Sequence, residues 1–360
     1  MGFEERVIYS PTKMTNMILQ SLGRQIISWL PAKCAIAKRG ATLSPSLRTS
    51  LMARFLSAVA ARCACLPADL DTNLGIDQRL RVKISSSKSA LLFGAPHLFI
   101  GERSSLDLAA ALLKYADCFI DVGSNIGLYI FYLRCRDGYL KPIYFFEADP
   151  DLFSGLKKNI SRNGLLNVEG FQVAVAEKVG KAIFFQNRTD DSSGTLIKED
   201  WSKHFLQPIE VDKTSFATFV NERQLKNVCA KVDVEGAEES FFDGARSSLD
   251  KLKFLIIEIL GPAIGRNFPA KLIREGNFRA YYINDYRLEH SPLGDFTYAA
   301  PFYNWLFCRE SPASLHDKLI GSRFQVIASN QPSAVTLGGG PHSFERLKYK
   351  IICAKTKYES

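Results

Sequence analysis

From about residue 80 onward, short apolar runs alternate with segments of helical periodicity. The pattern gives a helix at 106–115 and strands at 81–84, 91–100, 118–122, 142–148, 168–176, 230–234 and 254–259. Strands that are apolar nearly throughout and separated by helix-length segments are typical of a parallel sheet covered on both faces. The pattern therefore predicts an open α/β sheet, in which ligands bind beyond the carboxyl ends of the strands.

The pattern is different at both ends of the chain. Apolar residues recur every four positions from Met14 to Leu30, which predicts amphipathic helices within residues 1–62. Such helices either pack on the main domain or a partner, or lie on an anionic membrane surface. Towards the other end, the less regular pattern predicts one helix and two strands, at 270–275, 279–284 and 304–308.

Composition and charge narrow the classes of function. The 360 residues are 46% hydrophobic and 23% charged, as in an ordinary globular protein, and their net charge is +9. Residues 1–62 carry +7 of this charge, so the rest of the chain is nearly neutral. We therefore expect no nucleic-acid partner for the main domain, whereas a peripheral membrane contact through residues 1–62 stays open.

Cysteine spacing and the length of the apolar runs bear on location. The eight cysteines are too few for a disulfide scaffold, and Cys63 and Cys65 have neither zinc-type nor redox-type spacing. No apolar run is long enough to span a membrane, and the first residues lack the features of a secretory signal. We expect a reduced, cytoplasmic protein without a bound metal, and the oligomeric state stays open.

The first candidate site lies where the run 118–122 ends. Gly123 permits a tight turn and Gly127 permits close packing of the next helix, but Asn125 replaces the middle glycine of a dinucleotide-binding turn. The following strand ends at Glu147, the position from which a carboxylate binds both hydroxyls of a ribose. The turn and this carboxylate together predict a nucleoside site.

Further acidic residues gather at the same predicted edge of the sheet. Asp233 closes a buried strand, and Glu235 follows it. With Asp121 and Glu147 they would surround the mouth of the sheet with negative charge. Such a field repels a dinucleotide phosphate and suits a ligand with a ribose and a cationic centre, as in S-adenosylmethionine (SAM). Asp149 reads as a helix cap rather than a ligand contact.

Five segments of the sequence form a recognisable series in order and spacing: FIDVGSNIG (119–127), FEADP (146–150), SS (192–193), KVDVEGAE (231–238) and IIE (256–258). This series resembles the FkbM family of SAM-dependent methyltransferases. The resemblance covers about residues 115–262. It implies a class I methyltransferase fold, with a mostly parallel, seven-stranded sheet whose last strand is antiparallel. It also implies methyl transfer, usually to a hydroxyl oxygen of a sugar, polyketide or other small metabolite.

The resemblance implies roles for individual residues. Four residues would line the methionine and ribose parts of SAM: Asp121, Gly123, Asn125 and Gly127. Glu147 would hold the ribose hydroxyls, and Asp233 and Glu235 would face the methyl group and a small-molecule or glycan acceptor. The resemblance does not extend to the two ends of the chain. We therefore divide the chain into an N-terminal helical segment (1–70), a methyltransferase domain (71–310) and a C-terminal extension (311–360).

Methyl transfer to a hydroxyl requires in-line alignment and removal of a proton. A carboxylate beside the hydroxyl can accept that proton, so Asp233 is the first candidate base and Glu235 the second. His204 is the third candidate, on a loop that could cover the site.

Two other functions share these residues. A nicotinamide-dependent oxidoreductase would use the same strand-helix-strand unit, although the missing middle glycine and the acidic mouth argue against it. A non-catalytic SAM-binding scaffold would keep the fold and engage a membrane or RNA through its basic N-terminus. Binding of NAD without SAM would favour the first function, and SAM binding without turnover would favour the second.

Overall fold

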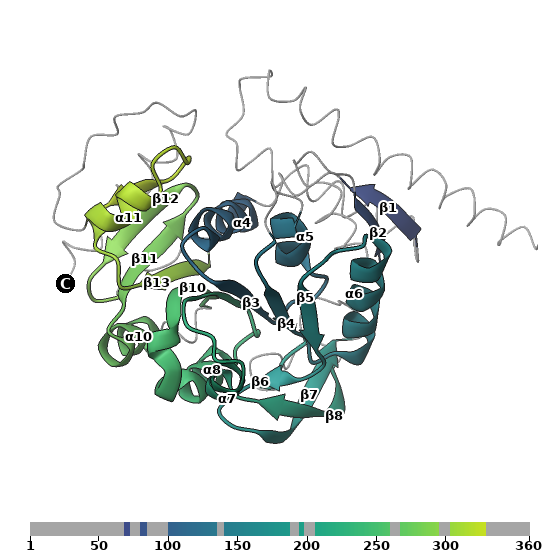
Figure 1. The fold of residues 1–360 in the computed structure, drawn as a ribbon. Coiled ribbons are helices and arrows are strands. Elements are labelled where there is room, and N and C mark those ends of the chain that lie inside the picture. The colour runs from purple at the N-terminus through teal and green to yellow at the C-terminus, as the bar shows by residue number, and fades with distance from the viewer. Residues whose placement is uncertain are drawn as a thin grey trace, which may run out of the picture.

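The computed structural model describes several separate parts of the chain (Figure 1): residues 68–72, 80–84, 100–134, 140–187, 194–197, 206–259, 267–294 and 303–328. The helices predicted within 1–62 lie outside these residues, as do His204 and the pair at 192–193. The last three residues of the predicted helical segment 1–70 are part of a strand, β1 (Ala68–Thr72), which pairs antiparallel with β2 (Leu80–Ile84).

A large sheet forms the centre of the molecule. In the part of the chain described, its strands are β3 (Cys118–Val122), β4 (Ile143–Phe146), β5 (Val168–Phe171), β9 (Val228–Val232), β10 (Leu252–Glu258), β11 (Arg279–Asn284), β12 (Arg287–Ser291), β13 (Asn304–Cys308) and β14 (Gln325–Ile327). They lie in the order β5–β4–β3–β9–β10–β13–β11–β12–β14. The first five are parallel to one another, and β13 is antiparallel to both of its neighbours. The predicted open, mostly parallel α/β sheet is confirmed, and so is its antiparallel strand.

The expected count of seven strands is wrong, because the described sheet has nine. Strand β12 turns back from β11 through Asp285, which has a φ of +53°, and β14 pairs with β12. Neither strand is an apolar run, so hydrophobicity alone did not reveal them. Strand β14 falls within the predicted extension 311–360, and Leu315 and Phe324 from the same stretch pack into the core.

Helices cover both faces of the sheet (Figure 1). One face carries α4 (Ile100–Leu113), α5 (Leu128–Arg134), α6 (Pro150–Arg162) and α11 (Pro312–Lys318), and the other carries α7 (Phe216–Glu222), α8 (Glu238–Ala245) and α10 (Phe268–Gly276). Because the parallel strands are buried on both sides, β3 and β9 consist of buried residues throughout. This burial explains the continuous apolar runs in the sequence.

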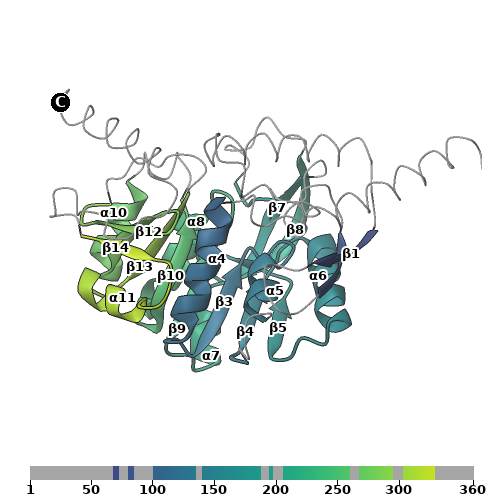
Figure 2. The same ribbon diagram turned by 90° about the horizontal axis from the view of Figure 1, so that it is seen from above.

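A second, three-stranded sheet lies near the β4–β5 edge of the main sheet (Figure 2). It contains β6 (Ala174–Val175), β7 (Gly180–Asn187) and β8 (Leu206–Thr214), in the order β6–β8–β7. The single strand predicted at 168–176 is therefore two short strands in different sheets. The strand predicted at 91–100 is also wrong at its end, because Ile100 begins α4. Periodicity does not show where a chain leaves one sheet for another.

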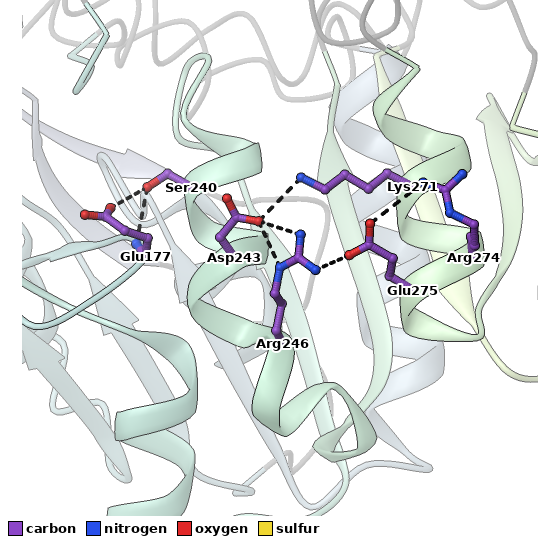
Figure 3. A network of polar contacts seen from close by, with 7 residues as sticks. All are labelled: Glu177, Ser240, Asp243, Arg246, Lys271, Arg274 and Glu275. Atoms are coloured by element: carbon purple, nitrogen blue, oxygen red, sulfur yellow. Dashed lines mark hydrogen bonds and ion pairs between the residues drawn. The ribbon is translucent and has the colours of Figure 1, made fainter.

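An exposed polar network joins α8 to α10 (Figure 3). Arg246 contacts Asp243 at 3.0 Å and also pairs with Glu275, while Lys271 reaches Asp243 at 3.4 Å. Ser240 on the same helix donates to Glu177, at 2.8 Å. The contacts of Asp243 with Lys271 and of Arg246 with Glu275 lie between the end of α8 and α10, whereas Ser240 connects α8 to the segment after β6.

Of the helices in the described ranges, none combines the length and apolar character that a membrane crossing needs.

Candidate active site

The turn after β3 is held against the strands on both of its sides. The backbone N–H groups of Gly123 and Ser124 both donate to the carbonyl of Phe146, each at 3.0 Å. Gly123 has a φ of +77°, and a Cβ placed on it would lie 1.8 Å from the carbonyl oxygen of Asp233. Only glycine fits here, because the backbone conformation and the close approach each exclude a side chain. The turn therefore contacts the ends of both β4 and β9.

Glu147 points towards this turn. Its carboxylate accepts the backbone N–H of Asn125 at 2.7 Å and that of Asp149 at 2.8 Å. Asn125 takes a φ of +50°, a conformation that asparagine tolerates better than most residues. Burial raises the pKa of Glu147 to about 7, although the two N–H groups act in the opposite direction. The turn and the carboxylate thus form one structural unit.

Asp233 lies directly after β9, and its side chain is 29% exposed. One of its carboxylate oxygens is 3.2 Å from the ammonium of Lys231, whose side chain is only 1% exposed. Burial alone would lower the pKa of the Lys231 ammonium, but the surrounding carboxylates, Asp233 foremost, raise it above its ordinary value. The edge of the sheet that was predicted to be acidic therefore also contains a buried positive charge. The sequence analysis counted only the carboxylates there and did not include Lys231.

Asp121 and Gly127 lie behind the pocket rather than on its wall. Asp121 is 2% exposed, is the register partner of Lys231, and has a carboxylate oxygen without a hydrogen bond. Burial raises the pKa of Asp121 to about 7, which Lys231 opposes. A Cβ on Gly127 would lie 2.4 Å from Leu156, so this glycine allows α5 to approach α6 closely. Asp121 and Gly127 therefore lie close to the pocket but do not line it.

Glu235 takes a φ of +50° beside Asp233 and lines the pocket. Its backbone carbonyl accepts the hydroxyl of the buried Thr195, at 2.7 Å. Thr195 is bonded through its backbone to Phe185 on β7, and its neighbours Gly194 and Leu196 line the pocket. Residues 194–197 belong to the loop that was predicted to cover the site. They line the pocket and are hydrogen-bonded to the segment after β9.

The pocket is a hollow that is partly open to solvent. The lining combines the predicted polar residues with an apolar wall from the end of β4, the start of α6 and the small sheet. Among its members are Gly123, Asn125, Glu147, Asp233, Glu235, Leu152, Val175 and Phe184. A polar edge facing an apolar wall suits a ligand with a flat apolar ring and a hydroxylated part.

Two residues of this site were not identified from the sequence. The sequence analysis included Lys231 only as part of a motif and gave it no role. A signal was available, because a lysine inside a buried strand needs a countercharge. Thr195 lies in a stretch with no periodic pattern, so no sequence signal could have found it. Within the described ranges, no three His, Cys, Asp or Glu side chains are grouped so that they could hold a metal ion.

One family model matches part of the chain, and several solved structures are similar to it. The sequence model of the methyltransferase FkbM domain matches residues 121–282. No curated protein sequence matches the chain. Among solved structures, methyltransferase FkbM from Methylobacillus flagellatus KT is 14% identical with a TM-score of 0.36, over 53% of this chain and 43% of that protein. The chain thus spans less than half of that protein's length.

Two further solved structures resemble the chain at a similar level. An O-methyltransferase from Bacillus cereus in complex with SAH is 12% identical with a TM-score of 0.34, over 57% of this chain and 79% of that one. An rRNA methylase from Streptococcus thermophilus is 13% identical with a TM-score of 0.33, over 57% and 93%. The residues that match the methyltransferase FkbM domain, 121–282, are just under half of the chain and include Gly123, Glu147 and Asp233, and this match supports the assignment of that part of the chain to the FkbM family.

Proposed function

We propose that this protein transfers a methyl group from SAM to a hydroxyl oxygen of a sugar, polyketide or other small metabolite. The observation that carries the proposal is the joint position of Glu147 and Asp233, which line one pocket on either side of the Gly123 turn. The first supplies a ribose acceptor, and the second lies where a proton acceptor is needed.

The residues present fit SAM. Each oxygen of Glu147 accepts one backbone N–H, and a carboxylate has about four acceptor positions, so capacity remains for two ribose hydroxyls. The apolar wall, with Leu152, Val175 and Phe184, offers a surface for an adenine ring. Asn125 and Gly123 present backbone at the turn, where the methionine part would lie. Asp121 would act from behind the wall, through the strand end that it supports.

The chemistry divides between the donor and this chain. When bound, SAM supplies a methyl group on a sulfonium, whose carbon–sulfur bond breaks and leaves its electron pair on sulfur. Asp233 accepts the proton that the acceptor hydroxyl loses as its oxygen forms the new bond to carbon. Glu147 and the Gly123 turn hold the alignment, which supplies much of the acceleration in a displacement of this kind. Glu235 is the alternative proton acceptor.

Calorimetry with SAM and with NAD tests the proposal. We expect the full chain to bind SAM and not NAD. Glu147→Ala should weaken SAM binding by about 10- to 100-fold, because hydrogen bonds to a charged group contribute about 1.5–3 kcal/mol. Glu210→Ala is the matched control, since this exposed glutamate pairs with Lys181 on the small sheet and should leave affinity unchanged.

Turnover separates an enzyme from a binding protein. With labelled SAM and a panel of hydroxylated sugars and metabolites, the wild type should transfer label, while Asp233→Asn should bind SAM normally and lose at least about 100-fold in rate. NAD binding in place of SAM would overturn the proposal in favour of an oxidoreductase. Tight SAM binding without transfer to any acceptor would favour a scaffold.

A further inference from the structure

Lys231 occupies an unusual position for a lysine. It lies inside β9, the fourth strand of the parallel region, with Asp121 of β3 and Ile256 of β10 as register partners. Its ammonium lies 3.2 Å from Asp233, donates to the carbonyl of Val232 at 3.2 Å, and lies 5.7 Å from the centre of the Tyr129 ring. A buried ammonium without a countercharge is very costly, so this geometry requires an ionised partner.

Glu258 completes the arrangement from the next strand. It ends β10 directly after Ile257, the register partner of Val232, and so lies beside Asp233 at the edge of the sheet. When two carboxyl groups share a buried site, one of them keeps its proton because two adjacent negative charges repel each other. Burial raises the pKa of Glu258 well above its ordinary value, and Asp233 raises it further. Since Asp233 also contacts the ammonium, the proton belongs on Glu258 and the negative charge on Asp233.

The surroundings are consistent with this assignment. The charged and titratable groups that face Asp233 in the described structure are Lys231 on β9, Glu258 on β10, Asp121 on β3, Glu102 on α4, Tyr129 on α5 and Glu238 on α8. Among them Lys231 is the one cation. Burial raises the pKa of Asp121 and of Glu238 to about 7, so both are partly protonated near neutral pH.

We propose that Lys231 is a positioning residue that keeps Asp233 ionised and directed at the pocket, while Glu258 holds the shared proton of the carboxyl pair. This inference rests on the proposed function, since it prepares Asp233 to accept the proton of the acceptor hydroxyl. Glu258 keeps its own proton throughout. Asp233 gains one proton when the methyl group is transferred and returns it to water through its exposed side.

Infrared spectroscopy of the full chain without SAM tests this assignment, because protonated and ionised carboxyl groups absorb separately. Spectra between about pH 5 and pH 9 would compare the wild type with Glu258→Gln, Lys231→Met and Lys231→Arg. The titration of Asp233 is obtained by subtracting, for each protein, the same protein carrying Asp233→Asn. Lys213→Met is the matched control, because it removes a lysine paired with Glu177 away from the pocket.

Glu258→Gln should remove the protonated-carboxyl band that persists at about pH 9 in the wild type. Asp121, Glu147 and Glu238, with pKa values of about 7, are ionised at that pH. Glutamine mimics the protonated acid, so the titration of Asp233 should move by less than about one pH unit. Should the band remain in Glu258→Gln and vanish in Asp233→Asn, the proton lies on Asp233 and the proposal is overturned. The isosteric change is expected to fold, so this result is available even when Lys231→Met does not fold.

Lys231→Met should raise the pH at which Asp233 titrates by about one to three units, because the adjacent positive charge is lost. Lys231→Arg should restore most of the shift, and Lys213→Met should cause none. An unchanged titration of Asp233 in folded Lys231→Met would contradict the proposal. Calorimetry keeps this separate from the proposed function: a chain that does not bind SAM refutes the methyltransferase activity, whereas the spectra alone decide the roles of Lys231 and Glu258.

Discussion

At the scale of single residues, Gly123 connects the predicted cofactor turn with the predicted base. A side chain at this position would meet the backbone of Asp233, which cannot rotate away as a flexible side chain can. The turn and the end of β9 therefore have one shared geometry. A change at one of them moves the other.

Substitution of Gly123 by alanine tests this contact. The positive φ should cost about 1–2 kcal/mol in the free energy of unfolding, and the clash about 1–3 kcal/mol more. Gly164→Ala is the control, because Gly164 has a φ of +58° with no atom within 4 Å of an added Cβ. Urea unfolding curves would measure both variants. Equal losses of stability in the two proteins would contradict the importance of the backbone contact.

Residue identities were predictable where a motif fixes the backbone. Gly123 follows a predicted strand, Glu147 and Asp233 lie at the ends of predicted strands, and the parallel topology brings such positions to one edge. The details were not predictable. Asp121 belongs to the same motif but faces α4 and α5, because alternate residues of a strand point to opposite faces and the motif does not reveal which face is the pocket.

At the scale of elements, the start of α6 links the main sheet to the small one. The predicted cap is confirmed: the carboxylate of Asp149 accepts the N–H groups of Asp151 and Leu152, at 2.8 and 3.2 Å, and Pro150 is the first helical residue. The other carboxylate oxygen accepts the side-chain amide of Gln186 on β7, at 2.8 Å. One side chain thus positions a helix and a strand that both line the pocket.

Removal of this cap should destabilise the fold more than an ordinary cap substitution. We expect Asp149→Ala to lower the free energy of unfolding by about 1–2 kcal/mol, since the helix cap and the bond to Gln186 are both lost. Asp149→Asn keeps an acceptor oxygen for the helix and should lose less than half as much. Thermal and urea unfolding would rank the two variants, and equal losses would show that the cap contributes little.

Element boundaries were predictable for only some of the buried strands. The runs at 118–122, 279–284 and 304–308 agree residue by residue with β3, β11 and β13, whereas the runs at 230–234 and 254–259 begin two residues after β9 and β10, although most residues of these strands are buried. Strands that are partly exposed, such as β5 and β12, lack a continuous apolar run. The small sheet was missed for the same reason, since β8 is mostly exposed or half-buried.

At the scale of the whole molecule, the buried carboxyl groups make stability depend on pH. The pKa of Asp121 is about 7 in the folded state, against 3.8 as its ordinary value. Because the folded pKa is the higher one, the contribution of Asp121 to stability is fully present below about pH 4 and is lost as the pH rises through 7. Glu147 and Glu238, with folded pKa values of about 7, act in the same direction.

Asp121→Asn should therefore change the pH dependence of stability. An amide mimics the protonated acid, so from pH 5 to pH 8 the variant should gain about 1–3 kcal/mol in the free energy of unfolding relative to the wild type. Urea unfolding of both proteins at the two pH values would measure this gain. A constant difference between them across this range would contradict the raised pKa of Asp121.

Because the Lys231 ammonium is almost fully buried, added salt screens its attraction to Asp233 much less than it screens exposed pairs such as Lys181 with Glu210. The interaction between these two charges therefore changes little between dilute buffer and concentrated salt. Ionic strength should mainly affect the approach of a charged acceptor to the opening of the pocket. A salt titration of methyl transfer should consequently alter the capture of such an acceptor and leave the transfer step itself almost untouched.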